Sequence, residues 1–226
     1  MSLALRSTAD ELMDADDLDP ATYAAVVGDL ARVNTVTLAR RPTLAFLRRA
    51  VRDGRLRLLD VGFGDGDMLR SIARWAVRHD VTAELVGVDL NPRSAPAAAA
   101  HTPADMPIRY VTGDYADQGG GWDAVVSSLV AHHMTPVQLL AFLRFMDADA
   151  RSWFVNDLHR HPVAHAGFPL LATLARWHPI VRHDGRVSIA RSFRPSEWRA
   201  ILAEAGVGDA RVFRAFPFRL CVECIR

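Results

Sequence analysis

Residues 57–77, "LRLLDVGFGDGDMLRSIARWA", carry the clearest indication of the fold in this sequence. A short apolar run reaches Asp60, and Asp67 opens an amphipathic stretch whose apolar residues recur at helical spacing. Between them, glycines occupy every second position, at Gly62, Gly64 and Gly66. We expect a buried strand, a glycine turn and a helix here, with a ligand lying close to the turn backbone because glycine has no Cβ.

Apolar strands and amphipathic helices continue to alternate after this turn. Further strands are expected at 83–91, 108–117 and 151–159, one within 122–134 and two more within 210–226. The main helices are expected at 67–80, 135–148 and 194–207. The alternation predicts an α/β fold, a Rossmann-like doubly wound sheet that is mostly parallel and carries a C-terminal antiparallel hairpin. Ligands of such sheets bind at the carboxyl ends of the strands.

The segments outside this alternation are expected to cover the ligand site. Residues 1–54 are interpreted as an N-terminal helical cap, and residues 55–226 as the α/β domain. An apolar insert at about 160–190, after the fifth strand, is expected to add to the cap. Within it, 169–181 indicates an apolar helix, and 182–193 indicates a turn followed by an extended piece.

Bulk properties exclude several classes of partner. The chain has 226 residues and a net charge of +1, which favours neither nucleic acid nor an anionic membrane surface. No apolar run is long enough to span a membrane, and the N-terminal stretch turns acidic where a signal peptide would stay apolar. We therefore expect a cytoplasmic protein that acts on a small molecule.

The basic residues narrow the choice of ligand, because all 27 of them are arginine. A phosphate loop and Schiff-base catalysis both require a lysine. A dinucleotide fingerprint would place its third glycine at the position of Asp67, where a carboxylate would repel a pyrophosphate. The turn therefore favours a nucleoside without phosphate, and a nicotinamide cofactor is kept as an alternative.

Motifs at successive strand ends resemble those of one enzyme family. "LLDVGFGDG" (58–66) is followed by Asp89 in "LVGVDLNP" and by Asp114 in "YVTGDYAD". "WDAVVSSLVAHHM" (122–134) resembles the fourth-strand motif, and "SEWRAILAEAGV" the C-terminal helix, of class I S-adenosylmethionine-dependent methyltransferases. The resemblance covers roughly residues 55–226 and is closest to the small-molecule branch that includes quinone-biosynthesis methyltransferases. The departures are modest: Phe63 and Asp65 fill variable positions, and Trp122 replaces the commoner phenylalanine.

The resemblance implies S-adenosyl-L-methionine as cofactor, S-adenosyl-L-homocysteine as product, and a role for each matched residue. Asp60 is expected to attract the ammonium and sulfonium end of the cofactor or to hold the loop. Asp89 is expected to accept from both ribose hydroxyls, and Asp114, beside the Tyr115 backbone, from the adenine amino group. The remaining residues expected at the cofactor are the loop residues Gly62, Phe63, Gly64, Asp65 and Gly66, Leu90 and Leu129 along the adenosine, and Arg40 at the carboxylate.

Histidines at two strand ends are candidate general bases. Histidine titrates near neutral pH and suits removal of a proton from a hydroxyl acceptor. His132 and His133 follow the fourth strand, and His159 lies in "NDLHRH" (156–161), where Asp157 is in position to orient it. We rank His133 first, then His159, then His132. Asp157 and His159 could also hold a metal ion, but no third ligand is evident near them in the sequence, so no metal is expected.

The acceptor is expected to be a small molecule. The fourth strand lacks the motifs of nucleobase amino-methyltransferases and of protein arginine methyltransferases, and the cap is rich in apolar and aromatic residues. We favour O-methylation of a phenolic, polyketide-like or quinone-like acceptor, with C-methylation of a quinone precursor close behind. A nicotinamide-dependent oxidoreductase and a cofactor-binding protein without methyl transfer are the alternatives from other classes.

Overall fold

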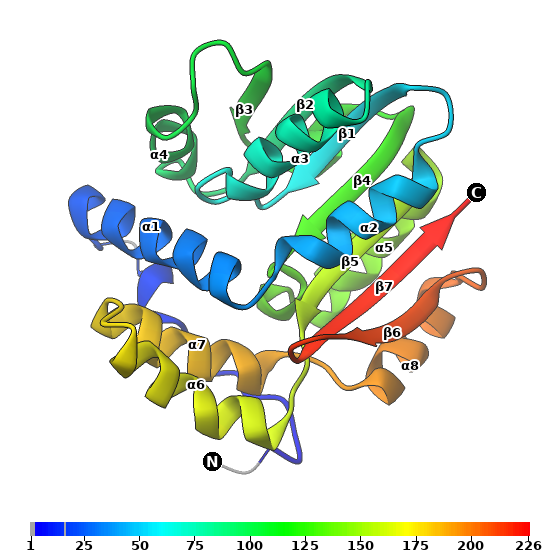
Figure 1. The fold of residues 1–226 in the computed structure, drawn as a ribbon. Coiled ribbons are helices and arrows are strands. Elements are labelled where there is room, and N and C mark those ends of the chain that lie inside the picture. Colours follow the sequence, from blue (N-terminus) through cyan, green and yellow to red (C-terminus); the bar gives the residue numbers. More distant parts are fainter. Residues whose placement is uncertain (1–2, 16) are drawn as a thin grey trace.

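The computed structural model describes residues 3–15 and 17–226, and its centre is a seven-stranded sheet (Figure 1). The strand order is β3-β2-β1-β4-β5-β7-β6, in which β7 runs antiparallel to both of its neighbours and the other pairs are parallel. The strands are β1 (Arg55–Val61), β2 (Thr82–Asp89), β3 (Ile108–Thr112), β4 (Trp122–Ser128), β5 (Ala150–Leu158), β6 (Arg211–Ala215) and β7 (Arg219–Ile225). The predicted mostly parallel sheet with a C-terminal antiparallel hairpin is therefore confirmed.

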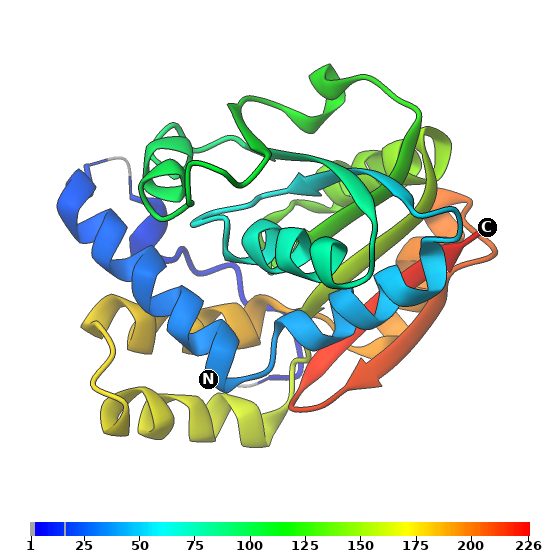
Figure 2. The ribbon, with the colours of Figure 1, turned by 45° about the horizontal axis from the view of Figure 1, so that its top comes forward.

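Helices cover both faces of this sheet and the edge at which the parallel strands end (Figures 1 and 2). Proline stands in the first turn of α1, α5, α6, α7 and α8, where its missing N–H leaves no helical bond unmade. The helices are α1 (Pro20–Val36), α2 (Arg40–Ala50), α3 (Asp67–Arg78), α4 (Ser94–Ala100), α5 (Pro136–Asp149), α6 (Pro162–Leu174), α7 (Pro179–Arg191) and α8 (Pro195–Ala205), with short 3-10 turns η1 (Leu12–Asp14), η2 (Tyr115–Gln118) and η3 (Ala131–His133).

Two apolar cores lie on opposite faces of the sheet. One joins α2, α3 and α4 to the strands and includes Phe46, Trp75 and Phe154. The other joins α5 and α8 to the strands and includes Trp153 and Trp198. Alternate residues of each strand therefore enter opposite cores, which is the pattern that burial on both faces requires.

The chain changes direction across the sheet at β1, and this places the strand-end residues together. β2 and β3 extend to one side of β1, while β4 and β5 extend to the other. Asp60 lies near the end of β1, Asp89 ends β2, and Ser128 ends β4. This reversal is the switch point at which doubly wound sheets bind their ligands.

The carboxyl edge of the sheet is covered by the N-terminal segment together with the insert after β5. α1 packs against α6 and α7 through a third apolar cluster that contains Val26, Val33, Ala172, Trp177 and Val181. Figure 1 shows these three helices beyond the strand ends, away from the two faces that α2 and α5 cover. The boundaries of the cap at 54 and of the insert at about 160–190 stay predictions.

One sequence-based expectation is wrong. Residues 182–193 were expected as a turn and an extended piece, but most of them belong to α7. His178 caps this helix by accepting from the Ile180 N–H, and Pro179 begins it. Val181, Ser188 and neighbouring residues are then buried at helical spacing against the rest of the cover, so tertiary packing overrides the turn signal of Asp184-Gly185.

One predicted strand also stops earlier than expected: β3 ends at Thr112, and the 3-10 turn η2 follows it. β4 ends at Ser128 and is followed by η3, so His132 and His133 come after the fourth strand as predicted. In the described residues, 3–15 and 17–226, no helix has both the length and the apolar character that crossing a membrane requires.

Candidate functional site

A cavity of about 680 Å³ lies between the carboxyl edge of the sheet and its cover. The glycine turn, the ends of β1 and β2 and the turn η3 line one part of it. Helices α1, α6 and α7 line the opposite part with apolar side chains such as Val27, Phe168 and Leu171. Eight of the predicted cofactor residues line this cavity: Asp60, Gly62, Phe63, Gly64, Asp65, Asp89, Leu90 and Leu129.

The three glycines of the turn have left-handed backbones but different surroundings. A Cβ on Gly62 would lie 2.3 Å from Val130 Cγ2, and one on Gly66 would lie 2.4 Å from the Tyr110 hydroxyl. A Cβ on Gly64 would meet nothing within 4 Å. Gly64 therefore faces open space at the position of a Cβ, whereas the missing Cβ of Gly62 and of Gly66 leaves room for a neighbouring side chain. Gly62 and Gly64 line the cavity and Gly66 does not, and the roles of all three at the cofactor stay predictions.

Asp60 is a buried carboxyl group without a full set of partners. The residue is 1% exposed, and its Oδ2 has no hydrogen-bond partner among the described residues. Burial raises the pKa of Asp60 to about 8, and the carboxylates of Asp67 and Asp89 add to this effect. A cation brought into the cavity would supply the charge that this carboxyl group lacks.

Asp89 holds the loops around the cavity through its carboxylate. Its Oδ2 accepts from the Gly64 N–H at 2.9 Å, and its Oδ1 accepts from the Asn91 N–H at 2.9 Å. Burial raises the pKa of Asp89 above its ordinary value, and these two backbone bonds oppose the shift. Each oxygen retains acceptor capacity for a further donor, such as a ribose hydroxyl.

The variable residues of the turn are engaged with the protein. The Phe63 ring packs against Tyr110 with centroids 4.9 Å apart. Asp65 forms ion pairs with Arg70 and His101, so its carboxylate holds the turn to α3 and to the segment after α4. Phe63 and Asp65 thus shape this wall of the cavity from within the protein.

Two predicted adenine residues are not brought into the cavity. Neither Asp114 nor Tyr115 is among the described residues that line it. Asp114 is exposed and accepts from the Ala116 N–H at 2.9 Å, which caps η2. Tyr115 packs against Phe142 and Phe145, with ring centroids 4.9 Å from each. Their predicted roles at the adenine stay predictions.

Arg40 is also outside the cavity, because Asp67 holds it elsewhere. Its Nε lies 2.9 Å from Asp67 Oδ2, and its Nη2 donates to the Ala31 carbonyl and to Thr35 Oγ1. The arginine that lines the cavity, alone of its kind among residues 3–15 and 17–226, is Arg219 at the start of β7. This geometry does not support the sequence-based placement of Arg40 at the cofactor carboxylate.

Arg219 is buried and incompletely paired. Its side chain is 2% exposed, and its Nη2 donates to Thr37 Oγ1 at 3.1 Å, while Nη1 has no hydrogen-bond partner in the described part of the chain. Burial lowers the pKa of Arg219, and the charge of Asp157 opposes that change. Sequence reasoning missed this residue because it belongs to the last strand, far from the glycine turn along the chain.

The histidines differ sharply in their surroundings. Asp157, which we expected to orient His159, instead bonds His132: its Oδ1 lies 2.7 Å from His132 Nδ1, and its Oδ2 accepts from the His132 N–H. Burial alone would lower the pKa of His132, but the charge and hydrogen bond of Asp157, together with Glu11, raise it to about 9. The predicted Asp157–His159 pair is therefore wrong.

His159 does not reach the cavity in the described structure. Burial and the nearby charge of Arg214 lower the pKa of His159 to about 4, and its ring packs against His161. The same residue bridges to Phe193 through its backbone. These contacts favour a structural role for His159 over the predicted catalytic one.

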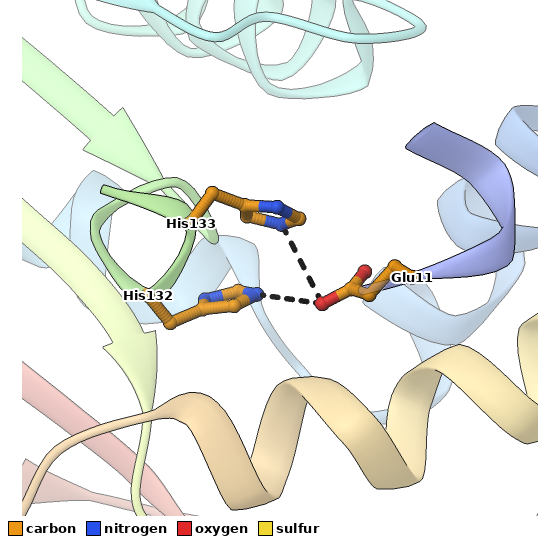
Figure 3. Close-up of side chains that lie close together, drawn as sticks. All are labelled: Glu11, His132 and His133. Atoms are coloured by element: carbon orange, nitrogen blue, oxygen red, sulfur yellow. Dashed lines mark ion pairs between the residues drawn. The ribbon is translucent and has the colours of Figure 1, made fainter. Parts of the chain in front are cut away.

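His132 and His133 share a carboxylate that sequence reasoning missed (Figure 3). Nε2 of His132 and Nε2 of His133 lie 3.6 and 3.7 Å from the same Oε1 of Glu11. His133 is 30% exposed and its Nδ1 lies 3.2 Å from Asp14 Oδ2. The available signal was an acidic residue inside the N-terminal cap, but nothing local showed that this segment returns to the end of β4.

Comparisons with known proteins agree with this architecture. Residues 58–148 match a family model described as a methyltransferase domain. The ubiquinone biosynthesis O-methyltransferase of Cereibacter sphaeroides is 28% identical over 158 residues, which is 67% of this chain and 60% of that protein. The match thus spans less than two thirds of the relative's length.

Solved structures of methyltransferases share the fold. The plantazolicin methyltransferase BpumL in complex with SAH superposes with a TM-score of 0.67 at 13% identity, over 93% of this chain and 92% of that one. The magnesium protoporphyrin IX methyltransferase of Synechocystis PCC 6803 with bound SAH gives 0.58 at 17% identity, over 95% and 90%. The Rossmann-like fold expected from the strand-end motifs is confirmed.

Proposed function

We propose that this chain, a class I methyltransferase by its domain match and its fold, transfers a methyl group from S-adenosyl-L-methionine to a hydroxyl group of a small phenolic, polyketide-like or quinone-like acceptor. One observation carries the proposal: a single cavity joins Asp60, Gly64 and Asp89 to the histidine pair after β4. The O-methyltransferase named among the relatives supports oxygen as the acceptor atom.

The cofactor fits the unpaired polar atoms of the cavity. The cofactor ammonium offers a partner for Asp60 Oδ2, and the cofactor carboxylate offers one for Arg219 Nη1, both of which are buried without a hydrogen-bond partner among the described residues. Asp89 has acceptor capacity left for the ribose, and Leu90 and Leu129 give apolar surface for the adenosine. We therefore assign the carboxylate to Arg219 in place of Arg40.

The protein's contribution to the reaction is alignment and activation of the acceptor. The bound cofactor supplies a methyl group that is already activated as part of a sulfonium. The glycine turn and Asp89 hold one reactant, while the apolar cover orients the other and excludes water. His132 and His133 lie along the same cavity, where the acceptor hydroxyl has to lose its proton.

The cover favours an acceptor with a flat apolar body. Leu30, Phe168 and Leu171 line the cavity opposite the glycine turn, and Val163 adds to the same wall. Such surfaces bind aromatic rings, while the histidine pair offers the polar contact that orients a hydroxyl group. C-methylation of a quinone precursor is the second candidate, because it uses the same apolar cover and differs in the acceptor atom.

Calorimetric titration with S-adenosyl-L-methionine, S-adenosyl-L-homocysteine and NADH is the first test. Micromolar binding of the first two, abolished in Asp89→Ala and retained in the control Asp117→Ala on the exposed η2 turn, would support the assignment. Binding of NADH alone would overturn it in favour of an oxidoreductase. Transfer of a labelled methyl group to a panel of ortho-dihydroxybenzenes and hydroxyquinones then tests catalysis.

Product analysis separates the two candidate reactions. An O-methyl ether is the expected product, and a ring C-methyl product would establish the second candidate. If the chain binds S-adenosyl-L-homocysteine tightly but methylates none of the acceptors in the panel, a cofactor-binding protein without methyl transfer would be favoured instead. His133→Ala is expected to lower turnover at least about 100-fold, while His159→Ala, outside the cavity, leaves it within about twofold of the parent chain.

A further inference from the structure

Three metal-binding side chains from distant parts of the sequence converge at the end of β4. Glu11 precedes η1 in the N-terminal segment, whereas His132 and His133 form most of η3. Figure 3 shows both imidazole rings directed at the same carboxylate. One donor atom from each residue can be chosen so that all three lie within 4.8 Å of one another.

The separations within this cluster are longer than hydrogen bonds. His132 Nε2 and His133 Nε2 lie 3.6 and 3.7 Å from Glu11 Oε1, beyond the usual limit for an N–H···O bond. Two ligands on a tetrahedral zinc ion, each bonded at about 2.1 Å, lie about 3.4 Å apart. The two histidine–glutamate separations are therefore close to the spacing of ligands around a small cation, and one donor atom from each of the three residues lies within 4.8 Å of the other two.

The donor atom of His132 is prepared to bind such a cation. Its Nε2 is buried and has no hydrogen-bond partner among residues 3–15 and 17–226. Since a carboxylate can only accept, the 2.7 Å bond between His132 Nδ1 and Asp157 Oδ1 places the proton on Nδ1. Nε2 then faces Glu11, and a cation that binds there displaces the proton that the imidazolium form carries on Nε2. A carboxylate behind a metal-bound histidine is the usual device that fixes its orientation.

The other two ligands are held in the same way. Ser188 Oγ donates to Glu11 Oε1 at 2.8 Å, which orients this buried carboxylate from α7. His133 Nδ1 lies 3.2 Å from Asp14 Oδ2, which leaves Nε2 of that ring directed at the shared centre. Each of the three ligands thus has a supporting partner of its own.

We propose that Glu11, His132 and His133 bind a divalent transition-metal cation of the zinc type, with at least one coordination position open toward the cavity. Two imidazoles and one carboxylate suit zinc and its neighbours, whereas magnesium prefers oxygen ligands alone. All three residues line the cavity, so the open position faces the acceptor. The expectation that the chain has no metal site is thereby revised.

The role of the cation in catalysis rests on the proposed function. An acceptor hydroxyl bound to the cation ionises more readily, and its proton leaves to solvent. The resulting oxyanion forms a bond to the methyl carbon as the bond from that carbon to sulfur breaks, and the electron pair stays on sulfur in S-adenosyl-L-homocysteine. His132 and His133 then act as ligands, and no histidine is needed as the base.

Metal titration of the full chain tests the site without any acceptor. Protein freed of metal by chelation is titrated with Co²⁺, followed by visible absorption, and with Zn²⁺ in competition with a chromophoric chelator. We expect one equivalent of each to bind. Glu11→Gln and His133→Ala should weaken binding at least about 100-fold, and Asp157→Asn about 10- to 100-fold. His79→Ala, at the far end of α3, should bind as the parent chain does.

The outcomes separate this inference from the proposed function. The proposed site would be disproved if the parent chain bound no stoichiometric metal, or if binding survived both Glu11→Gln and His133→Ala. Glu11, His132 and His133 would then be only a group of ion-paired side chains. Glutamine is nearly isosteric with glutamate, so Glu11→Gln should fold normally. Thermal unfolding of this variant checks that any loss of metal binding does not result from a loss of folding. If the chain binds the cofactor but no metal, only the proposed cation site is disproved. If it binds metal but no cofactor, only the proposed methyltransferase function is disproved.

Discussion

At the scale of the residue, Asp60 is the most informative side chain of the site. Burial, reinforced by Asp67 and Asp89, holds the pKa of Asp60 at about 8 instead of 3.8. By linkage, this group lowers the free energy of unfolding of the cofactor-free chain as pH rises between these two values, because the folded state retains the proton longer. A bound ammonium group would reverse the preference by stabilising the carboxylate.

Cofactor affinity should therefore depend on pH through Asp60. Below pH 8, binding of an ammonium group to the ionised carboxylate releases one proton, so affinity is expected to rise up to about tenfold per pH unit between pH 6 and 7. Titration calorimetry with S-adenosyl-L-homocysteine in buffers of different ionisation enthalpy measures both quantities. Asp60→Asn should flatten the profile, and an unchanged slope in that variant would rule out this role.

Arg219 offers a second residue-level prediction. Arg219→Met should weaken binding of S-adenosyl-L-homocysteine about 10- to 100-fold, the equivalent of one charge-assisted hydrogen-bonded contact. Binding of 5′-methylthioadenosine, which has no carboxylate, should not change. Arg40→Met is the matched control, because Arg40 does not line the cavity and pairs with Asp67 instead. Equal losses for both ligands would indicate that Arg219 supports the fold instead.

At the scale of the element, the glycine turn combines packing with ligand access. The Val130 side chain occupies the space where a Cβ on Gly62 would lie, whereas the space around a Cβ on Gly64 is open. Both have left-handed backbones, with φ of 75° and 53°. An alanine at either position would therefore lose about 1–2 kcal/mol of stability through backbone strain. Only the alanine at position 62 would also clash with a neighbouring side chain.

Alanine at these two positions should separate stability from binding. Gly62→Ala is expected to lower the free energy of unfolding by at least about 3 kcal/mol, from backbone strain plus overpacking against Val130. Gly64→Ala should cost about 1–2 kcal/mol of stability but should abolish cofactor binding, because its Cβ would enter the cavity. Urea unfolding and calorimetry measure the two effects, and equal stability losses would contradict this division.

The α6–α7 pair gives an element-level test with an internal control. A Cβ on Gly185 of α7 would lie 2.0 Å from Phe168 Cε1, whereas one on Gly167 of α6 would meet nothing within 4 Å. Gly185→Ala should destabilise the chain by about 1–3 kcal/mol, and Gly167→Ala should be neutral or stabilise it by up to about 1 kcal/mol. Thermal unfolding ranks the two variants, and the reverse order would show that Phe168 moves aside without cost.

At the scale of the whole molecule, the site lies between a rigid sheet edge and a cover built from two distant segments. Val26 and Val33 of α1 pack against Ala172 and Val181 of the insert, so the two segments form one apolar unit. The cavity lies beneath this unit. A cofactor and an acceptor bound there would contact both the cover and the sheet edge, so we expect binding to restrict movement of the cover relative to the sheet.

Hydrogen exchange should detect this movement. Binding of S-adenosyl-L-homocysteine is expected to slow amide exchange in residues 20–36 and 162–191, while the central strands β1 and β4, already protected, change little. Mass spectrometry of exchanged peptides gives this comparison directly. Equal slowing across the sheet would mean that the ligand stabilises the whole chain and not the cover in particular.

From the amino-acid sequence alone, the strands of the sheet and the helices that alternate with them could be predicted, whereas α7 could not. Apolar runs that end in Asp60 and Asp89, separated by amphipathic helices, are local patterns, and parallel strands bring their carboxyl ends to one edge wherever such patterns repeat. Which side chains meet at that edge, by contrast, could be seen only in the folded chain. Asp157 pairs with His132 instead of its near neighbour His159, and Glu11 and Arg219 arrive from opposite ends of the chain. Contacts of this kind depend on how the cover and the last strands pack, and no local periodicity records that packing.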